Sequence, residues 1–478
     1  MNIHQILQER FGYCSFRSGQ QEVIEAILRK EDVLALLPTG TGKSLCYQLP
    51  AYMLQGPVLI ISPLLSLMQD QVDQLKKIGE KHVIAFNSFL SQQEKMNALQ
   101  YLEHYRFIFV SPEMLATQVF QERFKEIRYA FIVVDEAHCL SQWGFDFRPD
   151  YLRLKQFLSA IPKTPIVALT ATATNKVIED IKHYLMMTSP FEYIHSVDRP
   201  NIKLIKKYFN DRREKKDWLI EHIQSTAGPG IVYMQSKRRA DELADHLIQR
   251  GIACASYHAG LENEDRQFIQ QQFLNGSLHW VVATNAFGMG VHKDDIRQVI
   301  HESMPATVAN YLQEIGRAGR DGEDAVAIML TSPQDKELAS FIAEEDLPTN
   351  THIEAFLNNP TQKYDSAIFF AQYRMSETIY RVLQYWLSIE PVEQVKLRLD
   401  QIRLTKRNEV EKMASIIEGN SCIRQKVMEY FGQELSTPLD ACCSNCGLDE
   451  TVFLKENIIE NILLSNENWE RRLKNILL

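Results

Sequence analysis

The sequence predicts an α/β fold of two tandem lobes, each built on a parallel sheet, followed by a helical region that carries a cysteine cluster. Three observations indicate this. Short apolar runs alternate with polar-faced helical patterns in two successive series, which is typical of βαβ units. The chain has 478 residues, too many for a single hydrophobic core. After Pro348 the pattern becomes helical, and four cysteines cluster near the end.

The first α/β series runs from about residue 30 to residue 200. Helical patterns such as 65–78 and 91–104 separate its apolar runs, so helices should cover both faces of the sheet. The runs that we expect to be strands are 33–37, 58–61, 83–86, 107–110, 131–134 and 166–169.

The second series follows a charged stretch, Lys203 to Lys216, and a helix expected to begin near Asp217. Its expected strands are 231–233, 253–257, 281–283, 299–301 and 325–330. The expected helices of the last region are 352–358, 363–388, 391–416 and 420–431. The predicted domains are therefore 1–205, 206–345 and 346–447, with a tail, 448–478, that contains an amphipathic stretch from Ile458 to Leu477.

Composition excludes several classes of protein. Hydrophobic content of 45% and charged content of 24% are ordinary for a soluble globular protein. No run of 18 apolar residues and no secretory signal is visible, so we expect a cytoplasmic protein without a membrane partner, associated with the nucleoid if the source is bacterial. The net charge of −9 argues against a uniformly basic nucleic-acid coat but not against local basic surfaces. Four scattered cysteines are expected to be reduced and buried: Cys14, Cys46, Cys139 and Cys254.

A glycine-rich segment after the first strand predicts a triphosphate site. Glycine lets backbone amides approach phosphates, and a helix that begins near Lys43 adds its positive end. Lys43 is placed to reach the β- and γ-phosphates, and Ser44 is placed to bind Mg²⁺. Leu37 stands where the generic pattern has its first glycine, so taken alone the segment also fits an ordinary turn of a metabolic enzyme. The predicted nucleotide-binding residues are Thr39, Gly40, Thr41, Gly42, Lys43 and Ser44.

Two acidic residues after the fifth strand complete the expected NTPase centre. Asp135 would supply the second protein ligand to Mg²⁺. Glu136 would orient or deprotonate the attacking water. Two buried parallel strands that lead into these two segments describe an NTPase core.

The cysteine cluster predicts a structural Zn²⁺ site. Four thiolates with a two-residue spacer suit tetrahedral zinc, and disulfides are disfavoured where no signal peptide is seen. Cys442 and Cys443 are adjacent, which leaves open which of them is the ligand. The candidate ligands are Cys422, Cys442, Cys443 and Cys446.

A dozen ordered segments across about residues 5–447 resemble the RecQ family of DNA helicases, which belongs to superfamily 2. The stretch 37–50 matches the family's phosphate loop, which lacks the first generic glycine. The stretch 11–20 resembles the family's adenine-reading motif. There, Gln20 would hydrogen-bond the adenine edge, and Tyr13 and Arg17 would stack on the base. The stretch 168–174 resembles motif III, in which small hydroxyl residues hydrogen-bond the Asp-Glu pair.

The resemblance also implies DNA contacts. Ser62 and Ser111, at two strand ends, resemble backbone-contacting residues, although both serines also fit as helix N-caps and the two roles are compatible. The stretch 141–149 resembles the aromatic loop that couples DNA binding to ATP hydrolysis, with Phe145 where the family commonly has histidine. Its aromatic rings would stack on unpaired bases and its arginine would pair with phosphate or a loop carboxylate. The residues concerned are Trp143, Phe145, Phe147 and Arg148.

In the second lobe, the stretch 284–291 resembles motif V of the family, and the stretch 313–322 resembles motif VI. Arg317 and Arg320 are three residues apart, on one face of a helical turn. We expect Arg320 to be the arginine finger and Arg317 its partner on the phosphates.

The family implies two RecA-like lobes, a zinc subdomain, and ATP- and Mg²⁺-dependent unwinding of DNA in the 3′ to 5′ direction during repair or recombination. Single-stranded and forked duplex DNA are the expected partners of a monomer, with single-strand-binding or repair proteins as further candidates. Two alternatives stay open: a strand-annealing factor that uses ATP as a switch, and an RNA helicase. The basic residues of 391–416 predict either a duplex-binding surface or a solvated charged helix.

Overall fold

The structure is a computed structural model that describes residues 2–63, 65–87, 90–141, 149–226, 228–288, 293–358, 366–435 and 441–449. The chain forms two compact units. The first comprises Met1–Val197, Ser340–Glu409 and Tyr430–Gln433. The second comprises Asp198–Ala339, Val410–Glu429 and Glu434–Leu478.

The first unit is built on a seven-stranded sheet in the order β3-β4-β2-β5-β6-β1-β7, with every pairing parallel. All six predicted strands are present. The seventh, β7, was not predicted; it pairs with β1 at the edge of the sheet. The strands are β1 (Val33–Leu36), β2 (Val58–Ile61), β3 (Val83–Phe86), β4 (Phe107–Val110), β5 (Phe131–Val134), β6 (Ile166–Thr170) and β7 (Phe191–Ile194).

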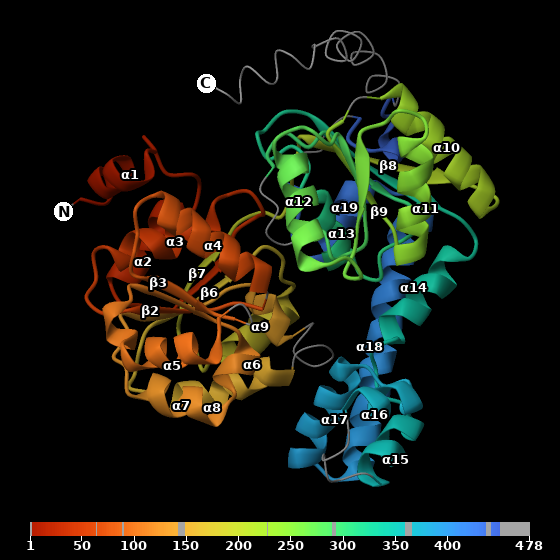
Figure 1. Cartoon of the computed structure of the whole chain (residues 1–478). Coiled ribbons are helices and arrows are strands. Elements are labelled where there is room, and N and C mark those ends of the chain that lie inside the picture. The colour runs from red at the N-terminus through yellow and green to blue at the C-terminus, as the bar shows by residue number, and fades with distance from the viewer. Residues whose placement is uncertain are drawn as a thin grey trace. The chain divides into compact units, whose positions relative to one another are not determined.

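Helices cover both faces of this sheet, because the central strands are apolar and buried along their whole length. Figure 1 shows α2, α3 and α4 on one face and α5, α7 and α8 on the other. The helices are α1 (Ile3–Phe11), α2 (Gln20–Leu28), α3 (Lys43–Ala51), α4 (Leu65–Lys77), α5 (Gln92–Gln100), α6 (Pro112–Leu115), α7 (Gln118–Lys125), α8 (Leu154–Ser159) and α9 (Asn175–Tyr184), with the 3₁₀ turns η1 (Leu102–His104), η2 (Ala137–Leu140) and η3 (Pro149–Arg153).

The second unit is built on a six-stranded parallel sheet in the order β10-β11-β9-β12-β13-β8. Its strands are β8 (Ile202–Tyr208), β9 (Gly230–Tyr233), β10 (Cys254–Tyr257), β11 (Trp280–Ala283), β12 (Gln298–His301) and β13 (Ala325–Thr331). Its helices include α10 (Arg212–Ser225), α11 (Lys237–Ile248), α12 (Asn263–Leu274) and α13 (Val308–Ile315). The two parallel sheets confirm the predicted fold class.

The charged stretch from Lys203 to Lys216 differs from its prediction. Its first part is strand β8, and all seven residues of this strand pair with β13. Helix α10 begins at Arg212 rather than near Asp217, because the carboxylate of Asp211 caps it by accepting hydrogen bonds from two backbone amides. The predicted domain boundary between 205 and 206 therefore falls inside a strand of the second sheet.

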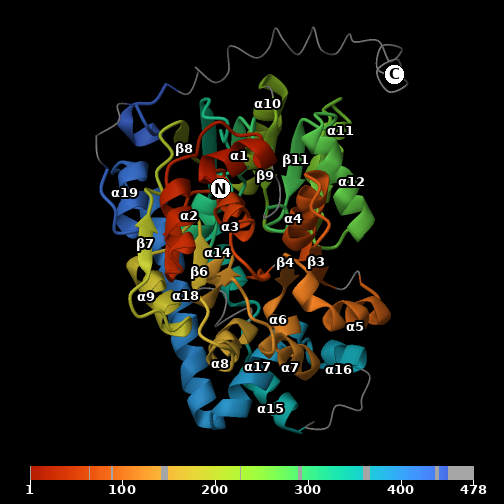
Figure 2. The same cartoon turned by 90° about the vertical axis from the view of Figure 1, so that its left-hand side faces the viewer.

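The last region is helical, as expected, but it contains one more helix break than predicted. The single helix expected at 363–388 is two helices, because Arg374 adopts φ +51° and Ser376 caps a new helix by accepting a hydrogen bond from Ile379 N–H. The helices α15, α16 and α17 gather around the first part of α18 (Figure 2). The helices are α14 (Asp335–Glu344), α15 (Asn350–Asn358), α16 (Ser366–Tyr373), α17 (Glu377–Ile389), α18 (Val392–Glu418) and α19 (Ile423–Tyr430), followed by the turn η4 (Ser444–Cys446).

The predicted subdomain 346–447 is divided between the two units. Residues up to Glu409 pack with the first sheet's unit, whereas Val410–Glu429 and the cysteine loop pack with the second. The reason is that α18 is long enough for its two ends to join different cores. No helix in the described ranges is both long and apolar enough to cross a membrane.

Candidate nucleotide and zinc sites

The loop between β1 and α3 has the backbone that phosphate binding requires. Gly40 and Gly42 have φ of +87° and +75°, a conformation that side chains disfavour. A Cβ on Gly42 would lie 2.9 Å from Gln20 Nε2, so there is also no room for one. Gly42 is the N-cap of α3, and Lys43 and Ser44 occupy the first turn of that helix. The predicted phosphate-binding residues therefore sit at the positive end of a nine-residue helix.

The acidic pair after β5 faces this loop. Lys43 Nζ lies 3.7 Å from Glu136 Oε1. The ammonium is buried and finds no hydrogen-bond partner among the residues that the structure describes. A buried ammonium without such a partner is costly, so Lys43 fits a site that receives an anion.

The carboxyl of Asp135 is adapted to a cation. Burial, and secondarily the neighbouring charge of Glu136, raises its pKa to about 7. Its Oδ1 also accepts a hydrogen bond of 3.0 Å from the backbone amide of Glu136. A divalent cation would offset the two crowded negative charges, and hydroxyl and carboxylate oxygens are the ligands that Mg²⁺ prefers. The donor set of Ser44 and Asp135 thus fits the predicted metal.

Glu136 is held in a backbone conformation that is unusual for its type. Its φ of +49° and ψ of +48° place it in the left-handed region, where residues other than glycine are uncommon. Glu136 lies between β5 and the turn η2, and the residue is 7% exposed. Such outliers cluster at functional sites, where the surrounding structure holds them.

The sequence interpretation missed His138. Its Nδ1 lies 3.0 Å from Thr170 Oγ1 and 3.4 Å from Glu136 Oε2. Burial lowers the pKa of His138, so its ring is neutral at neutral pH, with the same nitrogen near both residues. The resemblance to motif III implied hydrogen bonds from the hydroxyls of 168–174 to the Asp-Glu pair; the Thr170 hydroxyl instead hydrogen-bonds His138, which lies beside Glu136. The signal was present, since the histidine lies two residues after the glutamate.

The three predicted adenine-reading residues differ in their surroundings. Gln20 is buried, and its Nε2 donates to the carbonyls of Thr41 and Gly42 at 2.7 and 3.2 Å. Arg17 donates to the carbonyl of Gly40. Tyr13 is 57% exposed. Two of the three residues therefore hold the phosphate loop in this structure.

Both predicted DNA-contacting serines are buried. Ser111 caps α6 by accepting a hydrogen bond of 3.3 Å from the amide of Met114, which is the capping role weighed above. Ser62 Oγ is buried without a hydrogen-bond partner in the described part of the chain. Part of motif V, 289–291, lies outside the described residues. So do the four residues predicted in the aromatic loop: Trp143, Phe145, Phe147 and Arg148.

The second unit brings the two predicted arginines into a polar interior. Arg317 is 5% exposed and donates to the carbonyl of Gly288, in motif V. Arg320 Nε donates to the carbonyl of Gly316 at 3.5 Å. Burial, and then the charge of Arg317, lowers the pKa of Arg320 to about 10, so the desolvated guanidinium is still charged at neutral pH.

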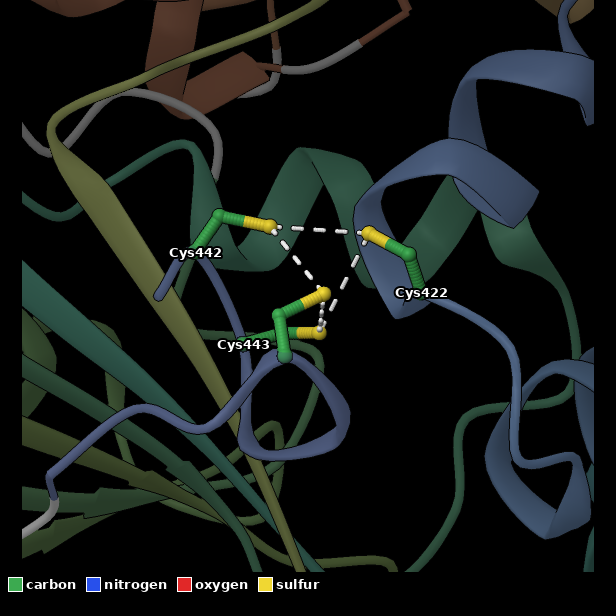
Figure 3. A group of neighbouring side chains, drawn as sticks. Cys422, Cys442 and Cys443 are labelled. Carbon is green, nitrogen blue, oxygen red and sulfur yellow. Dashed lines mark hydrogen bonds between the residues drawn. The ribbon is translucent and has the colours of Figure 1, made fainter. Parts of the chain in front are cut away.

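The four clustered cysteines meet in the second unit. Figure 3 shows Cys422, just before α19, with its sulfur pointing toward those of Cys442 and Cys443. The sulfur–sulfur distances include 3.5 Å between Cys422 and Cys442 and 3.5 Å between Cys443 and Cys446. All four sulfur atoms lie within 4.8 Å of one another. Tetrahedral zinc with bonds of about 2.3 Å separates its sulfurs by about 3.8 Å. The cluster fits zinc with both Cys442 and Cys443 included.

The basic side chains of α18 are already paired within the first unit. Lys396 lies 2.9 Å from Glu393, and Arg407 Nε lies 2.5 Å from Glu344. Arg403 contacts Asp400 at 2.7 Å. These partners favour the alternative of a charged helix over a duplex-binding surface.

Known families match three stretches of the chain. The DEAD/DEAH box helicase family matches residues 17–181, and the helicase conserved C-terminal domain matches 214–322. The RecQ zinc-binding family matches 392–447.

Two relatives and a solved structure extend these matches. The chain is 42% identical over 463 residues to the probable ATP-dependent DNA helicase RecS of Bacillus subtilis, covering 94% of this chain and 93% of that one. It is 35% identical over 445 residues to the ATP-dependent DNA helicase RecQ of Haemophilus influenzae, covering 93% of this chain and 62% of RecQ. The fold is similar to that of the DUF1998 helicase MrfA bound to DNA, with a TM-score of 0.58 at 19% identity, over 71% of this chain and 52% of that one.

Proposed function

Since this chain belongs to the RecQ family of ATP-dependent DNA helicases, we propose that it moves 3′ to 5′ along single-stranded DNA and separates duplexes during repair or recombination. The observation that carries the proposal is the pairing of Lys43 with Glu136 beside Asp135 in the first unit. These residue types in this arrangement suit phosphoryl transfer to water.

Different residues of the first unit bind the nucleotide, the metal and the attacking water. Lys43 and the amides at the start of α3 bind the phosphates of ATP, and Glu136 orients the attacking water and accepts its proton. Ser44 and Asp135 hold Mg²⁺, which supplies charge neutralisation on the phosphate oxygens. The adenine is recognised by Gln20, with Tyr13 and Arg17 stacked on its faces.

The second unit supplies the arginines. Arg320 acts as the finger that stabilises charge on the transferring phosphoryl group, and Arg317 assists on the phosphates. A partly desolvated guanidinium stabilises developing charge more strongly than a fully hydrated one, and the half-buried setting of Arg320 supports this role.

DNA binding is assigned to Ser62, Ser111 and the loop that contains Trp143, Phe145, Phe147 and Arg148. Stacking of aromatic rings on bases is tolerant of sequence, as movement along DNA requires. Zinc, held by the four cysteines, stabilises the fold and takes no part in the chemistry.

The test is strand separation with Lys43→Ala and wild-type protein on duplexes with a 3′ or a 5′ single-stranded tail. We expect wild type to unwind only the 3′-tailed DNA duplex and Lys43→Ala to unwind neither. ATP-driven unwinding by Lys43→Ala would contradict the assigned site. Unwinding of the matched RNA duplex would favour an RNA helicase, and annealing without unwinding would favour a strand-annealing factor.

A further inference from the structure

The segment 198–201, at the start of the second unit, contacts two parts of that unit that are far apart in sequence. On one side it meets helix α19, which follows Cys422. On the other it meets the loop after α13, which carries both candidate arginines. The segment thus lies between the zinc cysteines and the arginine loop.

Arg424 makes the contact with α19. This residue is 3% exposed, and its side chain forms an ion pair with Asp198. The same guanidinium donates to the carbonyl of Arg199 at 2.9 Å and to that of Ile202. A buried guanidinium with three acceptors has a fixed position, because moving it would leave charged and polar groups unsatisfied.

Arg199 and Asn201 make the contact with the arginine loop. Arg199 Nη2 donates to the carbonyl of Gly319 at 2.6 Å and to that of Ala318 at 3.3 Å. Asn201 Nδ2 donates to the carbonyls of Gly319 and Glu323, both at 2.8 Å. The fit is close, since a Cβ on Gly319 would lie 2.5 Å from Asn201 Nδ2.

The carbonyl of Gly319 is the important acceptor because it belongs to the same planar peptide group as the amide of Arg320. Two donors that hold this carbonyl therefore orient the backbone from which the Arg320 side chain leaves. Gly319 itself has φ +55°, a conformation that glycine adopts readily and residues with a Cβ disfavour.

We infer that Arg424, Asp198, Arg199 and Asn201 form a positioning relay that sets the orientation of Arg320 from the zinc-bearing end of the chain. The inference rests on the role given to Arg320 under the proposed function. The four residues act through Arg320 and touch no substrate. Misplacement of a catalytic group by about 1 Å costs up to about a hundredfold in rate.

The first test is Asn201→Asp, which keeps the size of the side chain but replaces the donor by an acceptor that repels both carbonyls. We expect the DNA-stimulated kcat for ATP to fall about tenfold or more, the KM for ATP to change less than about twofold, and zinc content to stay at the wild-type value. Asn275→Asp is the matched control, because Asn275 is exposed in the same unit and its Oδ1 remains an acceptor for Ser277 N–H. A wild-type kcat in Asn201→Asp would overturn the relay.

The second test repeats the comparison at α19 with Arg424→Gln against Lys426→Gln. Lys426 lies on the same helix in an exposed pair with Glu429. We expect only Arg424→Gln to lower kcat in protein that retains its zinc, as measured by metal analysis. Equal kcat values in the two variants would overturn the link to α19.

A double-mutant cycle separates positioning from general stability. In an Arg320→Ala background, Asn201→Asp should lower the residual kcat no further, since its target is gone. A full additional loss there would overturn the relay while leaving Arg320 as the finger. Wild-type kcat in Arg320→Ala alone would overturn the finger assignment and the relay with it.

Discussion

Lys43 Nζ lies 3.7 Å from Glu136 Oε1, so the phosphate loop and the acidic pair meet within the first unit. The relationship explains why a lysine can be buried here. Its charge is offset by a carboxylate that lies beyond hydrogen-bond reach, and its donors stay available for a phosphate.

Glu136→Gln tests the role of that carboxylate. The amide keeps the shape but cannot accept the proton of the attacking water, so we expect kcat for ATP hydrolysis to fall about 10²–10⁴-fold while nucleotide affinity persists. Steady-state hydrolysis measures kcat, and binding of a fluorescent ATP analogue measures the nucleotide affinity. Glu122→Gln, on the exposed side of α7 in the same unit, should match wild type. Hydrolysis at the wild-type rate in Glu136→Gln would exclude the assigned role.

Asp135→Asn should have a pH-dependent effect on stability. The pKa of Asp135 is raised from 3.8 to about 7 by burial, then by Glu136, so the folded state holds its proton where the unfolded state has lost it. Stability is therefore lost progressively as pH rises from about 4 to 7. Asparagine removes this penalty, and thermal unfolding without nucleotide should show Asp135→Asn more stable than wild type at pH 8. At pH 4 the gain should be absent; an equal gain at both pH values would contradict the raised pKa.

The chemistry of the site was predictable because it depends on local patterns. Glycines, a lysine and a strand-ending acidic pair each carry their signal within a few residues, and the parallel strands bring them to one edge of the sheet. Strands β7 and β8 were missed for the opposite reason. The sequence of β8 places lysines between its apolar residues, and only the tertiary structure satisfies them: Lys206 Nζ donates to the carbonyl of Ile417 at 2.9 Å.

Contacts between distant segments left no pattern to find. Arg424 and Asp198 are 226 residues apart, and no sequence motif around either residue predicts their contact. The helix end at Arg374 was not predicted either, because a residue other than glycine takes the left-handed conformation there, with the amide of Met375 donating to the carbonyl of Phe370 at 3.0 Å. The site residues of the first unit were therefore foreseeable, whereas the positioning residues of the second were not.

Lys215→Met should destabilise the second unit strongly. Lys215 is fully buried, with Nζ 2.6 Å from Asp335 Oδ2 and 2.9 Å from the carbonyl of Glu302. Removing one partner leaves a buried carboxylate unpaired, which costs about 3–5 kcal/mol. Denaturant unfolding measures the loss. The control, Arg238→Met, breaks the exposed pair with Glu242 and should cost about 0–1 kcal/mol. Similar losses of unfolding free energy in the two variants would show that the buried ion pair stabilises the fold no more than the exposed one.

Serine substitution of the clustered cysteines tests whether the adjacent pair acts together at the zinc site. Cys442 and Cys443 both lie within 4.0 Å of another cluster sulfur, so we expect one zinc per wild-type chain and a loss of bound zinc in Cys442→Ser and Cys443→Ser alike. The cysteine loop also pairs with β8, where Leu204 N–H donates to the carbonyl of Cys442 at 3.2 Å.

Loss of zinc should therefore loosen the edge of the second sheet as well as the loop, which hydrogen exchange of the β8 amides would detect. Cys14 is exposed in the first unit, so the prediction that it is buried was wrong, and Cys14→Ser should keep its zinc and its exchange pattern. Full zinc content in Cys442→Ser or in Cys443→Ser would reduce the site to three of the four thiolates. Unchanged exchange in β8 after zinc loss would show that the strand pairing stands without the metal.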